Sequence, residues 1–251
     1  MSESPPQAIG WPRTELPRIV KVRQFLPADH LMNLGEEITQ RLLGAGIQDR
    51  VHAGQRVAIT AGSRGMGGFQ EIVKAVVEQV QACGAEPFIV PAMGSHGGAT
   101  AEGQQRLLAG LGISEQTVGC PIRPTMETVE LGSTKHGADV HYDRIAYEAD
   151  ATIVLGRCKT HPTLHEGNGS GLQKMVTIGL GKQRGAQAAH AHGLERSVLE
   201  VAPLALARGN IVLGINVIEN GYRRPHTIDV VPPEGFAESD QRCLDLARAY
   251  V

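Results

Sequence analysis

The stretch RVAITAGSRGMGGFQEIVKAVVEQVQAC, residues 56–83, decides the fold. Residues 56–60 form a short run rich in β-branched residues, and the glycine-rich loop 61–68 follows it. After the loop, apolar residues recur at helical spacing, which predicts a helix over residues 69–83. Its inner face would be formed by Ile72, Val73, Val76, Val77 and Val80. The stretch therefore predicts a strand, a glycine loop and a helix, the repeating unit of α/β folds.

The same unit recurs outward from this stretch. Residues 87–91 (PFIVP) predict a second strand, followed by the loop 93–99 and a helix with Thr100 as its N-cap. Residues 150–155 (DATIVL) and 210–217 (NIVLGINV) are apolar, β-branched runs, typical of parallel strands covered on both faces. The repetition predicts the α/β class, as a Rossmann-like, three-layer domain with a largely parallel sheet.

The remaining patterns define the ends of the domain. Residues 1–18 contain four prolines and little periodicity, so we expect an extended N-terminal arm, with the domain over residues 19–251. Helical periodicity and a β-rich run predict two more helices and one more strand, over residues 33–45, 237–250 and 18–25.

Composition narrows the function class. The 251 residues carry 24 basic and 26 acidic side chains, a net charge of -2, which argues against a nucleic-acid partner. No apolar run approaches the roughly 20 residues that a membrane span needs, and no secretory signal opens the chain. The four cysteines form no CxxC pair, so we expect reduced thiols in a cytoplasmic protein.

Two loops at predicted strand ends hold candidate site residues. Arg64 lies in the first glycine loop, where backbone N–H groups and a guanidinium suit an anion such as a carboxylate or phosphate. The loop is neither a dinucleotide fingerprint nor a Walker A loop, and it can also be interpreted as a glycine turn with a solvated arginine. His96 lies between glycines in the second loop, a place that suits a general acid or base as well as an incidental loop histidine.

The third loop, residues 156–174, is the most informative. It contains His161, His165, Glu166 and Lys174, and His190 follows Lys174 by sixteen residues. Histidines gather in this half of the chain, which favours a site over chance placement, although an adventitious metal site or plain surface loops would give the same pattern. The HEXXH motif of zinc peptidases and the GxSxG elbow of hydrolases are both absent from the sequence.

The order of these motifs resembles lactate racemase and its relatives, the nickel-pincer racemase group. The shared features, over about residues 56–217, are GSHGGAT (94–100), EADATIVLGRCKTH (148–161) and GSGLQK (169–174) followed by AQAAH (186–190). Each motif alone is loose, but their order is specific. The resemblance implies a racemase or epimerase of a 2-hydroxy acid that uses Ni(II) in a nickel-pincer nucleotide, a pyridinium-derived cofactor covalently tethered to a lysine and made by cofactor-biosynthesis proteins.

The resemblance also implies a role for each candidate residue. Lys174 would be the tether and His190 the nickel ligand, and square-planar nickel with soft donors and one imidazole is chemically reasonable. His96 and His161 would act as acid and base on the two faces of the substrate, and Arg64 would bind its carboxylate or an anion of the cofactor.

Two features depart from the family pattern. The stretch between His161 and Lys174 is longer than in lactate racemase, which makes His165 an alternative second base. The family's C-terminal domain, which closes over the site, is absent from these 251 residues, so we expect this chain to bind cofactor without necessarily turning over substrate. The sequence leaves two alternatives open: a non-catalytic nucleotide- or anion-binding domain, and a hydrolase or isomerase that uses an ordinary divalent metal.

Overall fold

A mixed five-stranded sheet forms the centre of the protein. The fold is that of a computed structural model, which describes residues 17–161, 164 and 169–250. The strands are β1 (Arg56–Ala61), β2 (Glu86–Pro91), β5 (Ala151–Cys158), β6 (Ile211–Glu219) and β7 (Pro225–Val231), in the order β2-β1-β5-β6-β7. The first four are parallel and only β7 runs antiparallel, against β6. The predicted α/β fold with a largely parallel sheet is confirmed.

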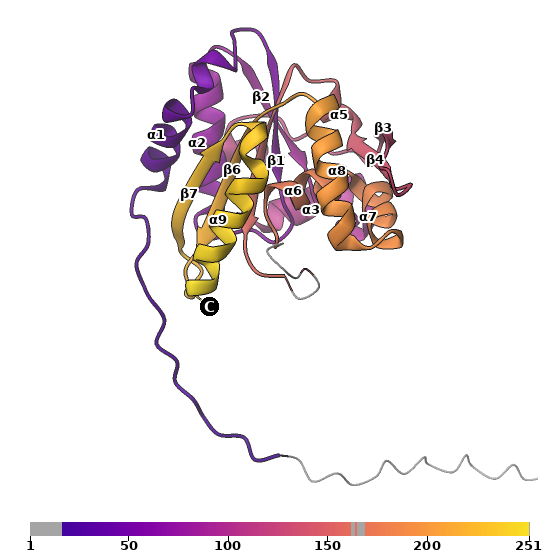
Figure 1. The fold of residues 1–251 in the computed structure, drawn as a ribbon. Helices are drawn as coiled ribbons and strands as arrows, with labels where there is room; N and C mark the ends of the chain where they lie inside the picture. The colour runs from indigo at the N-terminus through magenta and orange to yellow at the C-terminus, as the bar shows by residue number, and fades with distance from the viewer. Residues whose placement is uncertain (1–16, 162–163, 165–168, 251) are drawn as a thin grey trace, which may run out of the picture.

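Helices cover both faces of the sheet because its strands are apolar on both sides. In β1, Val57 and Ile59 pack into one core with the helices α1 (Leu34–Gly44) and α2 (Phe69–Ala82). Ala58 points the other way, into a second core with α8 (Leu194–Arg208) and α9 (Phe236–Ala249). Figure 1 shows α8 and α9 in front of the sheet. The three-layer prediction is therefore also confirmed.

Shorter elements connect the layers. The helices α3 (Ala101–Gly110) and α4 (Glu115–Val118) follow β2, and Thr100 caps α3 as predicted, because its hydroxyl accepts a hydrogen bond from the N–H of Gly103 at 3.0 Å. A hairpin of β3 (Thr128–Ser133) and β4 (Asp139–Asp143) forms a second sheet, and α5 (Arg144–Tyr147) follows it.

The segment after β5 is helical and irregular. It comprises α6 (Leu172–Lys174), a π-helix (Met175–Gly179) and α7 (Lys182–Ala191). Lys182, at the start of α7, has a φ of 54°, in the left-handed region that side chains other than glycine rarely adopt. π-Helical turns are uncommon and are frequently found at functional sites, so this segment is a candidate for one.

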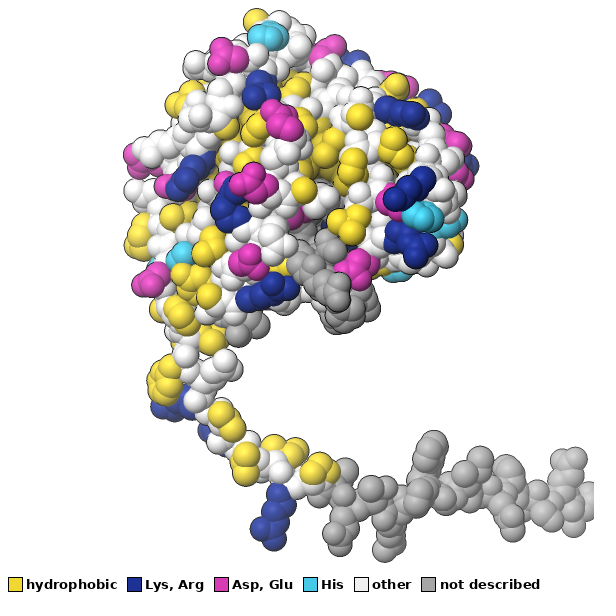
Figure 2. All heavy atoms as spheres, viewed as in Figure 1, with side chains coloured by type: hydrophobic (Ala, Val, Ile, Leu, Met, Phe, Trp, Pro, Cys, Tyr) yellow, Lys and Arg dark blue, Asp and Glu magenta, His cyan; other side chains and the backbone are white. Residues whose placement is uncertain are grey.

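The predicted strand over residues 18–25 is wrong. These residues have no regular secondary structure, and Ile19 and Phe25 are 95% and 82% exposed. The segment leads away from the body of the protein in Figure 1, and Figure 2 shows apolar and basic side chains along it. A β-branched run becomes a strand only when another backbone pairs with it, and within the described residues none pairs with this one.

The structure also describes the helices with respect to membrane spans and the state of the cysteines. Among the helices of the described residues, none combines the length and the apolar character that crossing a bilayer requires. The four cysteines, Cys83, Cys120, Cys158 and Cys243, are all free thiols.

Candidate active site

The carboxyl ends of three neighbouring parallel strands bring the candidate residues to one edge of the sheet. Arg64 follows β1, His96 follows β2 and His161 follows β5, and these strands are adjacent in the order β2-β1-β5. Lys174 ends α6 and His190 lies in the last turn of α7. Ligands of open α/β sheets bind at this edge, where neighbouring loops diverge.

Electrostatic interactions show that the five residues share one neighbourhood. Besides burial, the charges of Arg64 and Lys174 lower the pKa of His96. Burial and then the charges of Lys174, Lys159 and His190 lower the pKa of His161. Because such effects act only over short distances, each of the five candidate residues lies near at least one other of them.

Lys174 is the most strongly perturbed of the candidates. Burial, followed by the charges of Lys159 and Arg64, lowers the pKa of its ammonium group to about 8. Its Nζ donates a hydrogen bond of 3.5 Å to Ser170 Oγ, and the π-helix begins at the next residue. A lysine with this pKa carries a substantial fraction of neutral amine at mildly alkaline pH, and neutral amine is the nucleophilic form.

The His96 side chain is held by Ser63, whose Oγ lies 2.5 Å from Nδ1 of the imidazole. Both residues follow the ends of neighbouring strands, β1 and β2. Since Nδ1 is engaged by the hydroxyl, Nε2 is the ring nitrogen left for a ligand. The lowered pKa keeps the imidazole neutral at physiological pH, which is the state a general base needs.

A buried polar network holds the backbone around His96. The amide of Gln104, on α3, donates to the carbonyl groups of Gly94 at 2.8 Å and His96 at 3.3 Å. Lys182 fixes the orientation of that amide, because its Nζ lies 3.5 Å from Gln104 Oε1 and also donates to the carbonyl of Pro91. The ammonium forms an ion pair of 2.8 Å with Asp143, and both side chains are fully buried.

The positions of the histidines refine the predictions. His161 is half-buried beside the end of β5. His190, interpreted from sequence as a loop residue, instead lies on a helix with its side chain exposed. The alternative second base, His165, lies outside the described residues, as does Glu166.

Cations dominate the charged groups at this edge. Burial, then Arg157 and then Arg64 lower the pKa of Lys159. Burial, then Lys159 and then Arg64 lower the pKa of Lys174. Arg157 is paired with Glu219 at 2.7 Å, and the same carboxylate accepts a 2.7 Å hydrogen bond from the N–H of Gly67. An anionic ligand would relieve the repulsion among the remaining cations.

Sequence reasoning missed three of the residues that shape this site: Ser63, Gln104 and Lys182. Ser63 shares the glycine loop with Arg64, which was an available signal. Gln104 and Lys182 act through contacts between positions 78 apart in the chain, and no local pattern marks such a pair.

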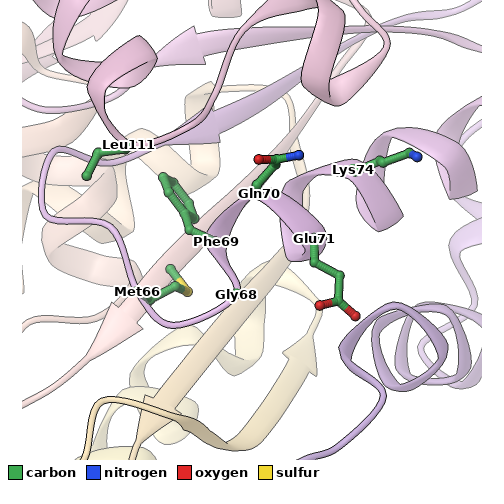
Figure 3. A pocket seen from close by; sticks show the side chains of 7 residues that line it. All are labelled: Met66, Gly68, Phe69, Gln70, Glu71, Lys74 and Leu111. Atoms are coloured by element: carbon green, nitrogen blue, oxygen red, sulfur yellow. The ribbon is translucent and has the colours of Figure 1, made fainter.

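A surface pocket lies at the start of α2, where the end of the glycine loop forms part of its lining. Figure 3 shows the side chains around it, and none of the five candidate residues is among them. Its lining is Met66, Gly68, Phe69, Gln70, Glu71, Lys74 and Leu111.

Comparison with known proteins identifies the family. The profile of the lactate racemase N-terminal domain matches residues 19–200, a stretch that contains all five candidate residues. The chain belongs to this family. A search of curated proteins finds no match.

A solved structure has a similar fold. The lactate racemase apoprotein from Thermoanaerobacterium thermosaccharolyticum superposes with a TM-score of 0.60 and 14% sequence identity, over 85% of this chain. The chain covers 55% of the length of that structure. At this identity the likeness concerns the fold. In this chain, residues 201–251 lie beyond the matched stretch and contribute the end of α8, β6, β7 and α9.

Proposed function

We propose that this chain is the cofactor-binding domain of a nickel-dependent racemase or epimerase that acts on a 2-hydroxy acid. The observation that carries the proposal is the convergence of Arg64, His96, His161, Lys174 and His190 on one edge of the sheet. The family match supports a racemase class, and the cationic surroundings support an anionic substrate and a phosphate-bearing cofactor.

The residues of the site fit a lysine-tethered nickel-pincer nucleotide. The lowered pKa of Lys174 supplies the reactive amine that a covalent tether needs. A metal whose other donors come from the cofactor needs a single imidazole from the protein, for which we propose His190. When bound, the cofactor would supply the centre that exchanges hydride with C2 of the substrate.

The acid–base work is assigned to two histidines. His96 would accept the proton of the substrate hydroxyl at Nε2, while its Nδ1–H donates to Ser63 Oγ. His161 would do the same for the opposite enantiomer, because the two enantiomers present their hydroxyl groups in different directions. Arg64 would hold the substrate carboxylate through its planar guanidinium.

Partners and location follow from the same proposal. The cofactor-biosynthesis proteins would load Lys174, and a C-terminal domain of the kind that the family resemblance implies would close over the site. The free thiols support a cytoplasmic location.

Co-expression with the cofactor-biosynthesis proteins tests the tether. We expect an adduct on Lys174 by intact-mass and peptide analysis, together with nickel by elemental analysis. Lys174→Ala should lose the adduct, whereas Lys74→Ala, at an exposed lysine of α2 paired with Glu78, should retain it. His190→Ala should keep its fold and lose nickel. A wild-type chain that is folded yet carries neither adduct nor nickel would overturn the proposal.

A non-catalytic anion- or nucleotide-binding domain is the second candidate, and the cluster of Arg64, Lys159 and Lys174 favours it equally well. The two differ in what happens at C2. Nucleotide binding without inversion of any 2-hydroxy acid, measured by chiral chromatography on the protein with its C-terminal domain present, would support this candidate. The divalent-metal alternative gains no support from the described part of the chain.

A further inference from the structure

Asp240, on the C-terminal helix α9, contacts the backbone directly ahead of Lys174. Its Oδ1 accepts a 2.7 Å hydrogen bond from the N–H of Leu172, and its Oδ2 accepts one of 2.9 Å from the N–H of Gln173. The amide of Asn216, on β6, donates a third at 2.8 Å. Burial raises the pKa of this carboxyl, and the three hydrogen bonds act against that shift.

The two N–H groups are those that the start of a helix leaves without intrahelical partners. α6 begins at Leu172 and continues into the π-helix, so its first N–H groups need acceptors from elsewhere. A carboxylate is the strongest acceptor available, and its charge also complements the positive end of the helical turn. Asp240 therefore caps, from a distance of 68 positions along the chain, the turn that carries the lysine.

Gly171 provides the space for this contact. Its φ of -172° is ordinary extended backbone, so the local conformation does not demand glycine. A Cβ at this position would overlap the Asp240 carboxylate. The glycine is thus explained by the approach of α9 and not by a turn.

We infer that Asp240 is a positioning residue that directs the side chain of Lys174 into the site. It acts through the backbone of Leu172 and Gln173, and it reaches the site from the region beyond residues 19–200 that the family profile covers. The tethering part of this inference rests on the proposed function, whereas the placement of the amine does not.

The chemistry of Lys174 gives the inference a direct readout. Burial, Lys159 and Arg64 lower the pKa of this amine, and Asp240 is not among the groups that shift it in either direction. Loss of the cap should release the turn, let the amine reach solvent, and so raise its pKa even though a negative charge has been removed from the protein. A purely electrostatic role of Asp240 would move the pKa in the opposite direction.

Competitive acylation of the cofactor-free full chain with acetic anhydride measures this pKa. Peptide mass spectrometry follows acylation of Lys174 across a pH series. For Asp240→Asn we expect the midpoint to rise by about one pH unit, since the amine regains water. Asp245→Asn is the matched control, because this exposed residue of the same helix contacts Gln241 and Arg248. The Lys174 midpoint in this variant should equal that of the wild type.

Gly171→Ala provides a second variant that leaves every charge in place. Its methyl group should displace the carboxylate from the two N–H groups and raise the midpoint in the same direction as Asp240→Asn. This variant also decides the matter if Asp240→Asn fails to fold. Folding of each variant is checked by circular dichroism and a cooperative thermal transition.

The outcomes separate the two proposals. A raised Lys174 midpoint in either folded variant, with about tenfold less adduct after co-expression with the cofactor-biosynthesis proteins, supports both. A raised midpoint with no adduct even in the wild type keeps the positioning role and overturns the tether. Folded variants whose midpoints are unchanged or lowered overturn the positioning role.

Discussion

Two helical segments on opposite faces of the sheet follow different rules. α2 buries an almost wholly apolar face, including Ile72 and Val76, and its helix is regular throughout. The segment 172–191 buries Gln173, Thr177 and Lys182, contains a π-helix and places a lysine in the left-handed region. One face of this protein therefore contributes mainly stability, while the other holds polar groups in fixed positions at some cost in stability.

The largest effect should come from Lys182→Met, which leaves the buried Asp143 carboxylate without its partner. Removal of one member of a buried ion pair costs about 3–5 kcal/mol, so we expect the free energy of unfolding in urea to fall by that amount. The double variant Lys182→Met/Asp143→Leu should recover part of the loss. A single variant as stable as the wild type would mean that the buried Asp143 carboxylate does not need Lys182, and the contrast between the two segments would lose its support.

A smaller effect is expected from Ile72→Val on the apolar face. Removal of one methylene from a fully buried position costs about 1 kcal/mol. The same urea titration measures this loss, and acylation of Lys174 should keep its midpoint because α2 and α6 pack into different cores, on opposite faces of the sheet. If the midpoint moved together with stability, the two faces would not be independent, and the comparison would fail.

The smallest effect is a gain in stability from Lys174→Met. The pKa of this lysine is about 8 in the folded protein and near its ordinary value of 10.5 in the unfolded chain, so the unfolded state binds more protons between these values. Stability of the wild type therefore rises with pH through this window, and its deficit is fully present below it. At neutral pH the variant should be more stable by about half a kcal/mol, because solvent still screens the amine.

Thermal denaturation across the same pH range checks the sign. The difference between Lys174→Met and the wild type should shrink as the pH rises from about 8 towards the ordinary lysine pKa. A difference that grows with pH would show that the folded protein favours the charged amine, contrary to the environment described for it.

Local pattern predicted the part of the fold that is locally determined. The strands β1, β2, β5 and β6 are apolar runs, and the helices α1, α2 and α9 have apolar residues at helical spacing. α3 was predicted from its N-cap, Thr100. β3 and β4 were not predicted because their hairpin is partly exposed and carries charged residues. α8 was not predicted either, because it contains Pro203, and proline is uncommon in the interior of a helix.

The sequence indicates the candidate residues of the site, but not the residues that hold them in place. The five candidates stand out in the sequence because each lies in a segment with an unusual local composition: Arg64, His96, His161, Lys174 and His190. The residues that hold these candidates in place lie in segments of ordinary composition. Gln104 and Asp240 are ordinary residues of amphipathic helices, and their role depends on contacts that only the folded chain creates.

The exposed run at residues 18–25 has a consequence for self-association. Ile19, Val22 and Phe25 are sheet-forming side chains beside an open backbone, the combination that invites chains to pair with one another. Basic residues at positions 18, 21 and 23 alternate with them, so two copies brought edge to edge would oppose like charges. Because salt screens that repulsion, the protein should aggregate least at low ionic strength and most at high ionic strength.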